Sequence, residues 1–249
     1  MQLNAESWGP ADAPPVVCLH GLTGHARRYR RLAEEALPHR RVVALDLRGH
    51  GRSTWAPPWG IEQHVADLVE AAAALGLEGA AWIGHSFGGR LVAELAARAP
   101  GIVGRAVLLD PALHLAPEVA HARARLAGEL PAFASEAAAI AFRLADSSLF
   151  TTSRETLAEE MHEHLVESAD GLLRYRISPE MAVVAWSEMA TPAPPWPACP
   201  TLAVLGERSW LSVDVPAREG IRVVRVPGGH SVLWDDFEAA ATAIAAFVV

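Results

Sequence analysis

Short apolar runs alternate with helical patterns along most of this chain, and this alternation constrains its fold more than any other feature. The apolar runs span residues 14–21, 41–49, 80–86, 105–112, 201–207 and 221–228. The helical patterns span residues 26–37, 61–76, 87–99 and 236–248. Strands that are apolar throughout and separated by helices are typical of a parallel sheet covered on both faces. The sequence therefore predicts an α/β fold with a mostly parallel sheet.

The alternation is interrupted between residues 112 and 197. This stretch has helical patterns and no convincing strand, and it runs into the proline-rich link "TPAPPWPACP". The patterns cover 118–130, 136–145, 154–168 and 179–189. An insertion at this point lies over the carboxyl ends of the strands, where open α/β sheets bind ligands. We therefore predict a core formed by 1–111 and 198–249, with 112–197 as an inserted helical cap.

Composition and charge exclude several classes of protein. The 249 residues are 51% hydrophobic, which is enough to form a large core. No apolar run approaches the ~20 residues of a membrane span. The net charge of −8 disfavours nucleic-acid binding, which needs a basic face. The stretch "MQLNAESWGPAD" has neither a basic start nor an apolar centre, so we expect no signal peptide and a cytoplasmic location.

Cofactor chemistry has little support in the residue types present. The cysteines, Cys18 and Cys199, are too few for a disulfide framework. Neither C-x-x-C nor H-E-x-x-H occurs, so metal-ligand spacing is absent. No lysine is present to form a Schiff base. We expect no metal and no cofactor, and a small-molecule substrate rather than nucleic acid or membrane as the partner.

The segment "GHSFGG" at 84–89 lies between an expected strand and an expected helix. A G-x-S-x-G motif in this setting makes a sharp turn that lifts the serine above the sheet. Gly84 and Gly88 stand where a Cβ would collide across the turn. Ser86 is then an exposed nucleophile, and the N-terminus of the following helix favours a developing oxyanion.

Four motifs in order make the chain resemble an α/β-hydrolase over nearly its whole length. They are "HGLTG" at 20–24, "DLRGHGRS" at 46–53, "GHSFGG" at 84–89 and "GGHSVLWDD" at 228–236. The resemblance implies a serine hydrolase of the esterase and lipase type. It also implies that the backbone N–H groups of Leu22 and Phe87 form an oxyanion hole.

Among the histidines, His230 is the best candidate for the general base. It follows the last expected strand in a Gly-Gly loop, and the chain order Ser…Asp…His of this fold requires a late histidine. His85 neighbours the nucleophile but points away along the turn, so we expect it to be structural. We expect His20 to support the backbone of the oxyanion loop.

The position of the catalytic acid is the open question in this sequence. The site that the family usually uses holds Ser209, which cannot carry the charge. Asp110 ends the strand next to that of Ser86, and adjacent strands lie ~4.8 Å apart. We therefore choose Asp110, with Asp214 and Glu207 as alternatives. We expect Asp46 to organise its own loop.

The predicted reaction is hydrolysis of a carboxylic ester of a mainly apolar small substrate through an acyl-enzyme. His114, Trp186 and Trp210 are expected to line the substrate pocket. Three alternatives stay open: hydrolysis of a carbon–carbon bond in ring-cleavage products, a cofactor-free oxygenase of this fold that relies on a His–Asp pair and keeps the serine as a helper, and a small-molecule receptor with slow turnover. A binding site for a second carboxylate would favour the carbon–carbon hydrolase.

Overall fold

The computed structural model describes residues 3–146 and 149–248. A seven-stranded sheet forms its centre, with the strand order β1-β3-β2-β4-β5-β9-β10. The strands are β1 (Ala5–Trp8), β2 (Pro15–Leu19), β3 (Arg41–Leu45), β4 (Ala80–His85), β5 (Val103–Leu109), β9 (Thr201–Gly206) and β10 (Ile221–Val226). All neighbouring strands are parallel except β1, which pairs antiparallel with β3. The predicted α/β fold class is confirmed.

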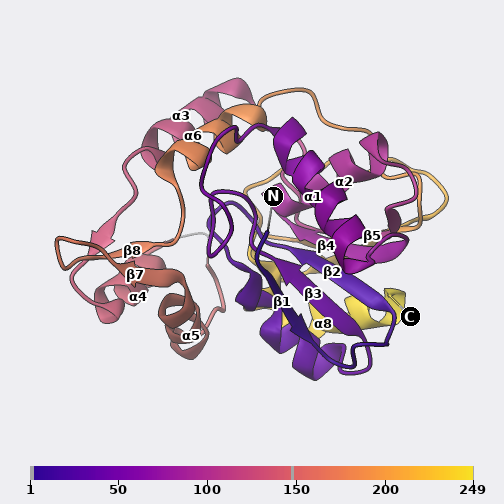
Figure 1. Cartoon of the computed structure of the whole chain (residues 1–249), viewed down its shortest axis with the longest axis horizontal. Helices are drawn as coiled ribbons and strands as arrows, with labels where there is room; N and C mark the ends of the chain where they lie inside the picture. The colour runs from indigo at the N-terminus through magenta and orange to yellow at the C-terminus, as the bar shows by residue number, and fades with distance from the viewer. Residues whose placement is uncertain (1–2, 147–148, 249) are drawn as a thin grey trace.

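Successive side chains of a strand point to opposite sides of the sheet. Both sides are covered here, so the central strands are buried on both faces. In β2, Val17 and Leu19 pack on one face, and Val16 and Cys18 pack on the other. The helices α1 (Ile61–Leu75) and α2 (Phe87–Arg98) cover the first face, and α8 (Phe237–Phe247) covers the second (Figure 1).

Two features at the N-terminal end differ from the sequence prediction. The strand β1 is a short edge strand whose residues are only half-buried or exposed, so it lacks the apolar pattern of the others. The helix expected over 26–37 consists of a 3-10 turn, η1 (Ala26–Tyr29), and a wide turn, η2 (Leu32–Ala36). This change of winding puts Tyr29 and Leu32 into the core, where the Tyr29 hydroxyl donates to the Leu19 carbonyl at 2.7 Å.

The segment 112–197, called the cap below, is not wholly helical as predicted. It contains α3 (Pro117–Ala127), β6 (Ala132–Phe133), α4 (Glu136–Leu144), α5 (Arg154–His164), β7 (Leu165–Glu167), β8 (Leu173–Tyr175) and α6 (Pro179–Glu188). The three strands form their own antiparallel sheet, in the order β6-β8-β7, and none is part of the main sheet. In Figure 1 this small sheet lies with α4 and α5 at the end of the molecule away from α1 and α2.

The missing strands have an identifiable signal in the sequence. The helix expected over 154–168 ends at His164, and the chain then forms a hairpin of β7 and β8. Asp170 and Gly171 lie in the connecting turn, where Gly171 has φ +76°. An Asp-Gly pair is a strong hairpin signal, and the helical periodicity of the flanking residues obscures it here.

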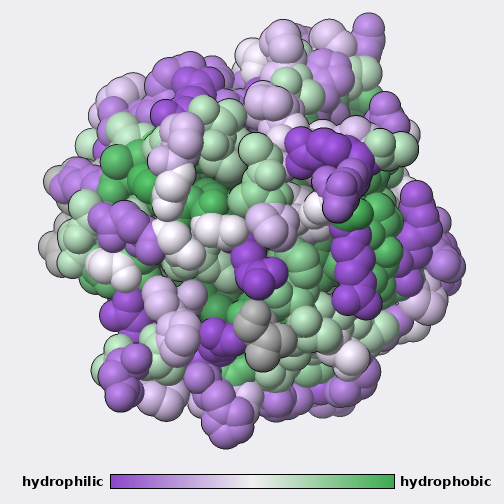
Figure 2. All heavy atoms as spheres, turned by 90° about the vertical axis from the view of Figure 1, so that its right-hand side faces the viewer, coloured by the Kyte–Doolittle hydropathy of each residue, from purple (hydrophilic) through white to green (hydrophobic). Residues whose placement is uncertain are grey.

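On the side of the core turned away from the small sheet, apolar and polar residues are interspersed (Figure 2). Among the described residues, no helix is both long enough and apolar enough to cross a membrane.

Candidate active site

Ser86 occupies a strained turn between β4 and α2. Its backbone has φ +54° and ψ −116°, a region that L-residues rarely adopt. A Cβ on Gly84 would lie 2.3 Å from the Gly88 carbonyl oxygen, and one on Gly88 would lie 2.4 Å from the Leu19 carbonyl oxygen. Only glycine fits at either position, so the G-x-S-x-G spacing follows from the close approach of backbone on both sides of Ser86.

A hydrogen-bonded series links Ser86, His230 and Asp110. His230 Nε2 lies 2.9 Å from Ser86 Oγ, and His230 Nδ1 lies 2.6 Å from Asp110 Oδ2. Since Asp110 is an acceptor, Nδ1 carries the proton and Nε2 is free to accept from the serine hydroxyl. Asp110 is 1% exposed, so water does not compete for this carboxylate.

The position of Asp110 follows from strand order. It directly follows β5, which lies between β4, the strand before Ser86, and β9. Its φ of +40° is unusual for a non-glycine residue; among the described residues only Ser86 shares this property. Asp110 Oδ1 accepts from the Gly206 backbone N–H at 3.2 Å. The turn therefore aims the carboxylate across the end of β9 toward His230.

Ser209, at the position that usually holds the acid in this family, contacts Asp110. Its hydroxyl donates to Asp110 Oδ2 at 2.5 Å and accepts from the Leu211 N–H at 3.1 Å. This supporting contact of Ser209 was not predicted from the sequence. Glu207 and Asp214 are both exposed, and within the described parts of the chain neither bonds to His230.

The loop at residues 20–24 is held by two buried histidines. His20 Nε2 accepts from the Leu47 N–H at 3.1 Å, so Nδ1 carries the ring proton and donates to the Gly21 carbonyl at 2.7 Å. His50 Nε2 donates to the Leu22 carbonyl at 2.6 Å. Burial lowers the pKa of both histidines, which keeps the rings neutral.

The contact of His20 with the Gly21 carbonyl orients one of the two N–H groups expected to bind an oxyanion, and the start of α2 places the other. In a planar trans peptide, C=O and N–H point in opposite directions. With the Gly21 carbonyl held by His20, the Leu22 N–H points away from His20. Phe87 is the first residue of α2, so its N–H has no acceptor within that helix.

Two further residues hold the loop that carries His230. His85 Nε2 donates to the His230 carbonyl at 2.8 Å, which agrees with the structural role expected for His85. Asp235 is buried and accepts from the Gly229 N–H at 2.8 Å and the Phe150 N–H at 3.0 Å. Asp235 thereby ties the histidine loop to the cap, a contact that the sequence analysis missed.

Ser86 and His230 open into a cavity of about 470 Å³ between the core and the cap. This size is within the ~300–1,000 Å³ of small-molecule sites. Trp186 and Trp210 line it as expected, but the expectation for His114 is wrong: it is exposed and is not part of the wall. The wall also contains arginines, which a mainly apolar substrate does not explain.

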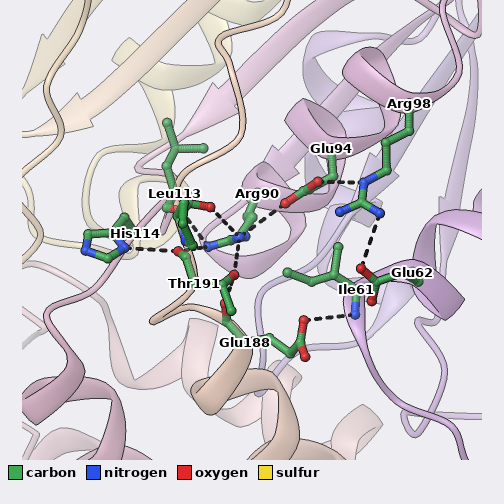
Figure 3. Close-up of polar contacts among 10 residues, drawn as sticks. Ile61, Glu62, Arg90, Glu94, Arg98, Leu113, His114, Glu188 and Thr191 are labelled. Atoms are coloured by element: carbon green, nitrogen blue, oxygen red, sulfur yellow. Dashed lines mark hydrogen bonds and ion pairs between the residues drawn. The ribbon is translucent and has the colours of Figure 1, made fainter.

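His114 lies instead where the cap joins the core (Figure 3). Its ring Nδ1 lies 3.1 Å from the Thr191 carbonyl oxygen. Arg90, which is buried on α2, donates to the carbonyls of Leu113 at 2.7 Å and Thr191 at 3.2 Å, and to Glu94 at 3.2 Å. One side chain on the helix that follows Ser86 therefore binds both connections of the cap.

Comparisons with known proteins agree with this architecture. The family model for the alpha/beta hydrolase fold matches residues 14–209. Lipase LipV of Mycobacterium tuberculosis is 36% identical over 190 residues, which are 76% of this chain and 72% of that protein.

Solved structures of the same fold match nearly the whole chain. E-2-(acetamidomethylene)succinate hydrolase superposes with a TM-score of 0.85 at 22% identity, over 99% of this chain and 94% of that one. A marine microorganism esterase superposes with a TM-score of 0.79 at 21% identity, over 99% of both chains. The chain therefore belongs to the α/β-hydrolase family and is a hydrolase of that fold.

Proposed function

We propose that this hydrolase cleaves carboxylic esters of small molecules through an acyl-enzyme formed on Ser86. The observation that carries the proposal is the hydrogen-bonded series from Ser86 Oγ to His230 at 2.9 Å and from His230 to Asp110 at 2.6 Å. These three side chains are the nucleophile, the base and the acid of a Ser-His-Asp triad. The lipase among the relatives supports the same chemistry.

In the proposed reaction, each proton transfer takes place between groups that are already in contact. Ser86 Oγ attacks the ester carbonyl while His230 Nε2 takes its proton, and the charge of Asp110 stabilises the imidazolium. The N–H groups of Leu22 and Phe87 bind the oxyanion, and each such donor contributes ~3 kcal/mol to transition-state stabilisation. His230 then protonates the leaving alkoxide and activates the water that releases the acid.

A fluorophosphonate probe tests this assignment together with para-nitrophenyl ester hydrolysis. The wild-type protein should be labelled on Ser86, and Ser86→Ala should lose labelling and about 10⁶-fold in kcat. Ser231→Ala is the matched control, because Ser231 also lines the cavity but its hydroxyl forms no hydrogen bond with a histidine in the described part of the chain. Labelling of the Ser86→Ala protein, or equal loss in the control, would refute the assignment.

Carbon–carbon bond hydrolysis of an acidic ring-cleavage product is the second candidate. The arginines in the cavity wall favour it, because that substrate carries a further carboxylate. A solved relative is also named as a hydrolase of a succinate derivative. Hydrolysis of simple esters at useful rates supports the first proposal, whereas labelling of Ser86 without ester turnover favours this candidate or a slow receptor.

A further inference from the structure

The charge of the cavity wall is opposite to that of the whole protein. The chain has a net charge of −8, yet the described residues of the wall include four arginines and two carboxylates. The arginines are Arg28, Arg123, Arg143 and Arg208, and the carboxylates are Asp146 and Glu160. A wall with an excess of two positive charges attracts an anion and raises its local concentration.

We propose that the substrate is an anionic ester, whose carboxylate or phosphate lies a few bonds from the scissile carbonyl and pairs with Arg123 and Arg208. The inference rests on the proposed esterase function and specifies its substrate class. It assigns these two arginines as specificity residues of the cavity.

Two of the four arginines already have a carboxylate partner. Arg28 Nε donates to Glu160 at 3.1 Å, and Arg143 Nη1 donates to Asp146 at 2.7 Å. In the part of the chain that the structure describes, Arg123 and Arg208 have no such partner and account for the excess charge. A carboxylate or phosphate on the substrate would supply the negatively charged partner that these two arginines lack.

Aromatic rings hold these two arginines without using their N–H groups. The Arg123 guanidinium lies 5.0 Å from the centre of the Trp210 ring, and that of Arg208 lies 4.1 Å from the centre of the Phe150 ring. Stacking on a ring face orients the guanidinium while its in-plane N–H groups stay available for a bidentate contact. Arg208 uses only Nε, which donates to the Pro227 carbonyl at 2.8 Å.

Arg123 is also within reach of a substrate bound at Ser86. The Trp210 ring that contacts Arg123 lies 5.6 Å from the His230 ring, centre to centre. A single indole therefore separates the guanidinium from the proposed base. An ester whose anionic group lies a few bonds from the carbonyl can span this distance.

Two buried polar side chains on the cavity wall lack hydrogen-bond partners among the described residues. His164 and Tyr175 line the wall and are 1% and 9% exposed. Within residues 3–146 and 149–248, neither ring nitrogen of His164 has a hydrogen-bond partner, and the Tyr175 hydroxyl has none either. Burial lowers the pKa of His164 well below its usual value, so its ring is neutral and offers one donor and one acceptor. Buried polar groups in proteins are normally paired, so these atoms form a polar cluster whose partners the described residues do not supply.

The test compares two para-nitrophenyl esters that share the same glutaryl chain. In the hydrogen glutarate the far carboxyl group is charged, and in the methyl glutarate it is a neutral methyl ester. We expect wild-type kcat/KM to be about tenfold higher for the charged ester at low salt, and this preference to shrink as salt screens the charges. Arg123→Gln and Arg208→Gln should each reduce the ratio, and the double variant should bring it close to one.

Arg125→Gln is the matched control. Arg125 lies on α3 two residues after Arg123 and is exposed like Arg123, but it is not among the described residues of the cavity wall. Residues two apart on a helix face different directions, so this variant removes the same charge without changing the site. The preference for the charged ester should be unchanged.

The outcomes separate this inference from the proposed function. If neither ester is hydrolysed, the esterase proposal fails. If both are hydrolysed equally well by the wild-type protein, the anionic subsite is refuted and the esterase proposal stands. Competition by free glutarate or by inorganic phosphate against the neutral ester identifies which of the two anions the arginines bind.

Discussion

Two histidine–carboxylate pairs lie at the cavity, and they are built differently. Beside Ser86, His230 donates to Asp110 at 2.6 Å, and the other contacts of this carboxylate are neutral donors, Gly206 and Ser209. Under the cap, His25 lies 3.0 Å from Glu160 without the alignment of a hydrogen bond, and Arg28 forms an ion pair with the same carboxylate.

The difference lies in what balances the buried negative charge. Burial alone would raise the pKa of Glu160, but Arg28 and His25 hold it well below its usual value. That charge is already balanced in the folded protein. Asp110 has no arginine partner among the described residues. When His230 takes up a proton, the imidazolium that forms is the cation that pairs with the Asp110 carboxylate. We infer that the Glu160 pair stabilises the cap against the core, whereas the Asp110 pair is available for chemistry.

The largest effect should come from Asp110→Asn. The amide keeps the shape of the side chain but removes the charge that stabilises the imidazolium, so kcat for a para-nitrophenyl ester should fall about 10⁴-fold. Since Ser209 Oγ lies 2.5 Å from Asp110 Oδ2, adding Ser209→Asp should restore part of the activity. A loss below tenfold in Asp110→Asn would mean that the two pairs do not differ as argued.

Glu160→Gln should show the opposite balance of effects. Removing one partner of a buried ion pair leaves Arg28 uncompensated, so the free energy of unfolding should fall by about 3 kcal/mol, while kcat changes far less than in Asp110→Asn. Urea denaturation and ester kinetics measure the two quantities. The double variant Arg28→Met with Glu160→Met should recover most of the stability, because it removes both charges together.

His64 extends the comparison, because it is a buried histidine with no carboxylate partner among the described residues. His64 is buried against the Phe87 ring, and burial lowers its pKa from 6.5 to about 3. The unfolded chain takes up a proton below pH 6.5 that the folded protein excludes, so stability is full above that pH and declines as the pH falls. Between about pH 7.5 and 5.5, wild type should lose about 1.4 kcal/mol more than His64→Phe. Urea denaturation at both pH values measures this, and parallel losses would contradict it.

Much of the geometry beside Ser86 was predictable because it depends on sheet order. Consecutive strands of a parallel sheet are often neighbours, and β4 and β5 are neighbours here, which puts Ser86 and Asp110 at adjacent strand ends. The glycines around Ser86 are required by backbone contacts that any sequence with this turn must accommodate.

The cap was less predictable because its strands are short and pair only with one another. Its three strands contain two or three residues each, too few for an alternating pattern to show. The cavity wall combines side chains from many separate segments, so its arginines carry no local signal. The prediction that His114 lines the pocket was wrong for a related reason. Its distance in sequence from the cap boundary does not reveal in which direction the chain turns as it leaves the core.

The smallest effect is expected for the two acids that the sequence left as alternatives. Glu207 and Asp214 are exposed, so their charges are surrounded by water and screened by salt. Neither can replace a carboxylate that is buried and 2.6 Å from the imidazole. Glu207→Gln and Asp214→Asn should therefore change kcat less than about twofold, as surface charges usually contribute under 1 kcal/mol. Each should be assayed beside Asp110→Asn with the same ester at the same pH. A hundredfold loss in either variant would move the acid away from Asp110, and the contrast between the two histidine–carboxylate pairs would then need a different explanation.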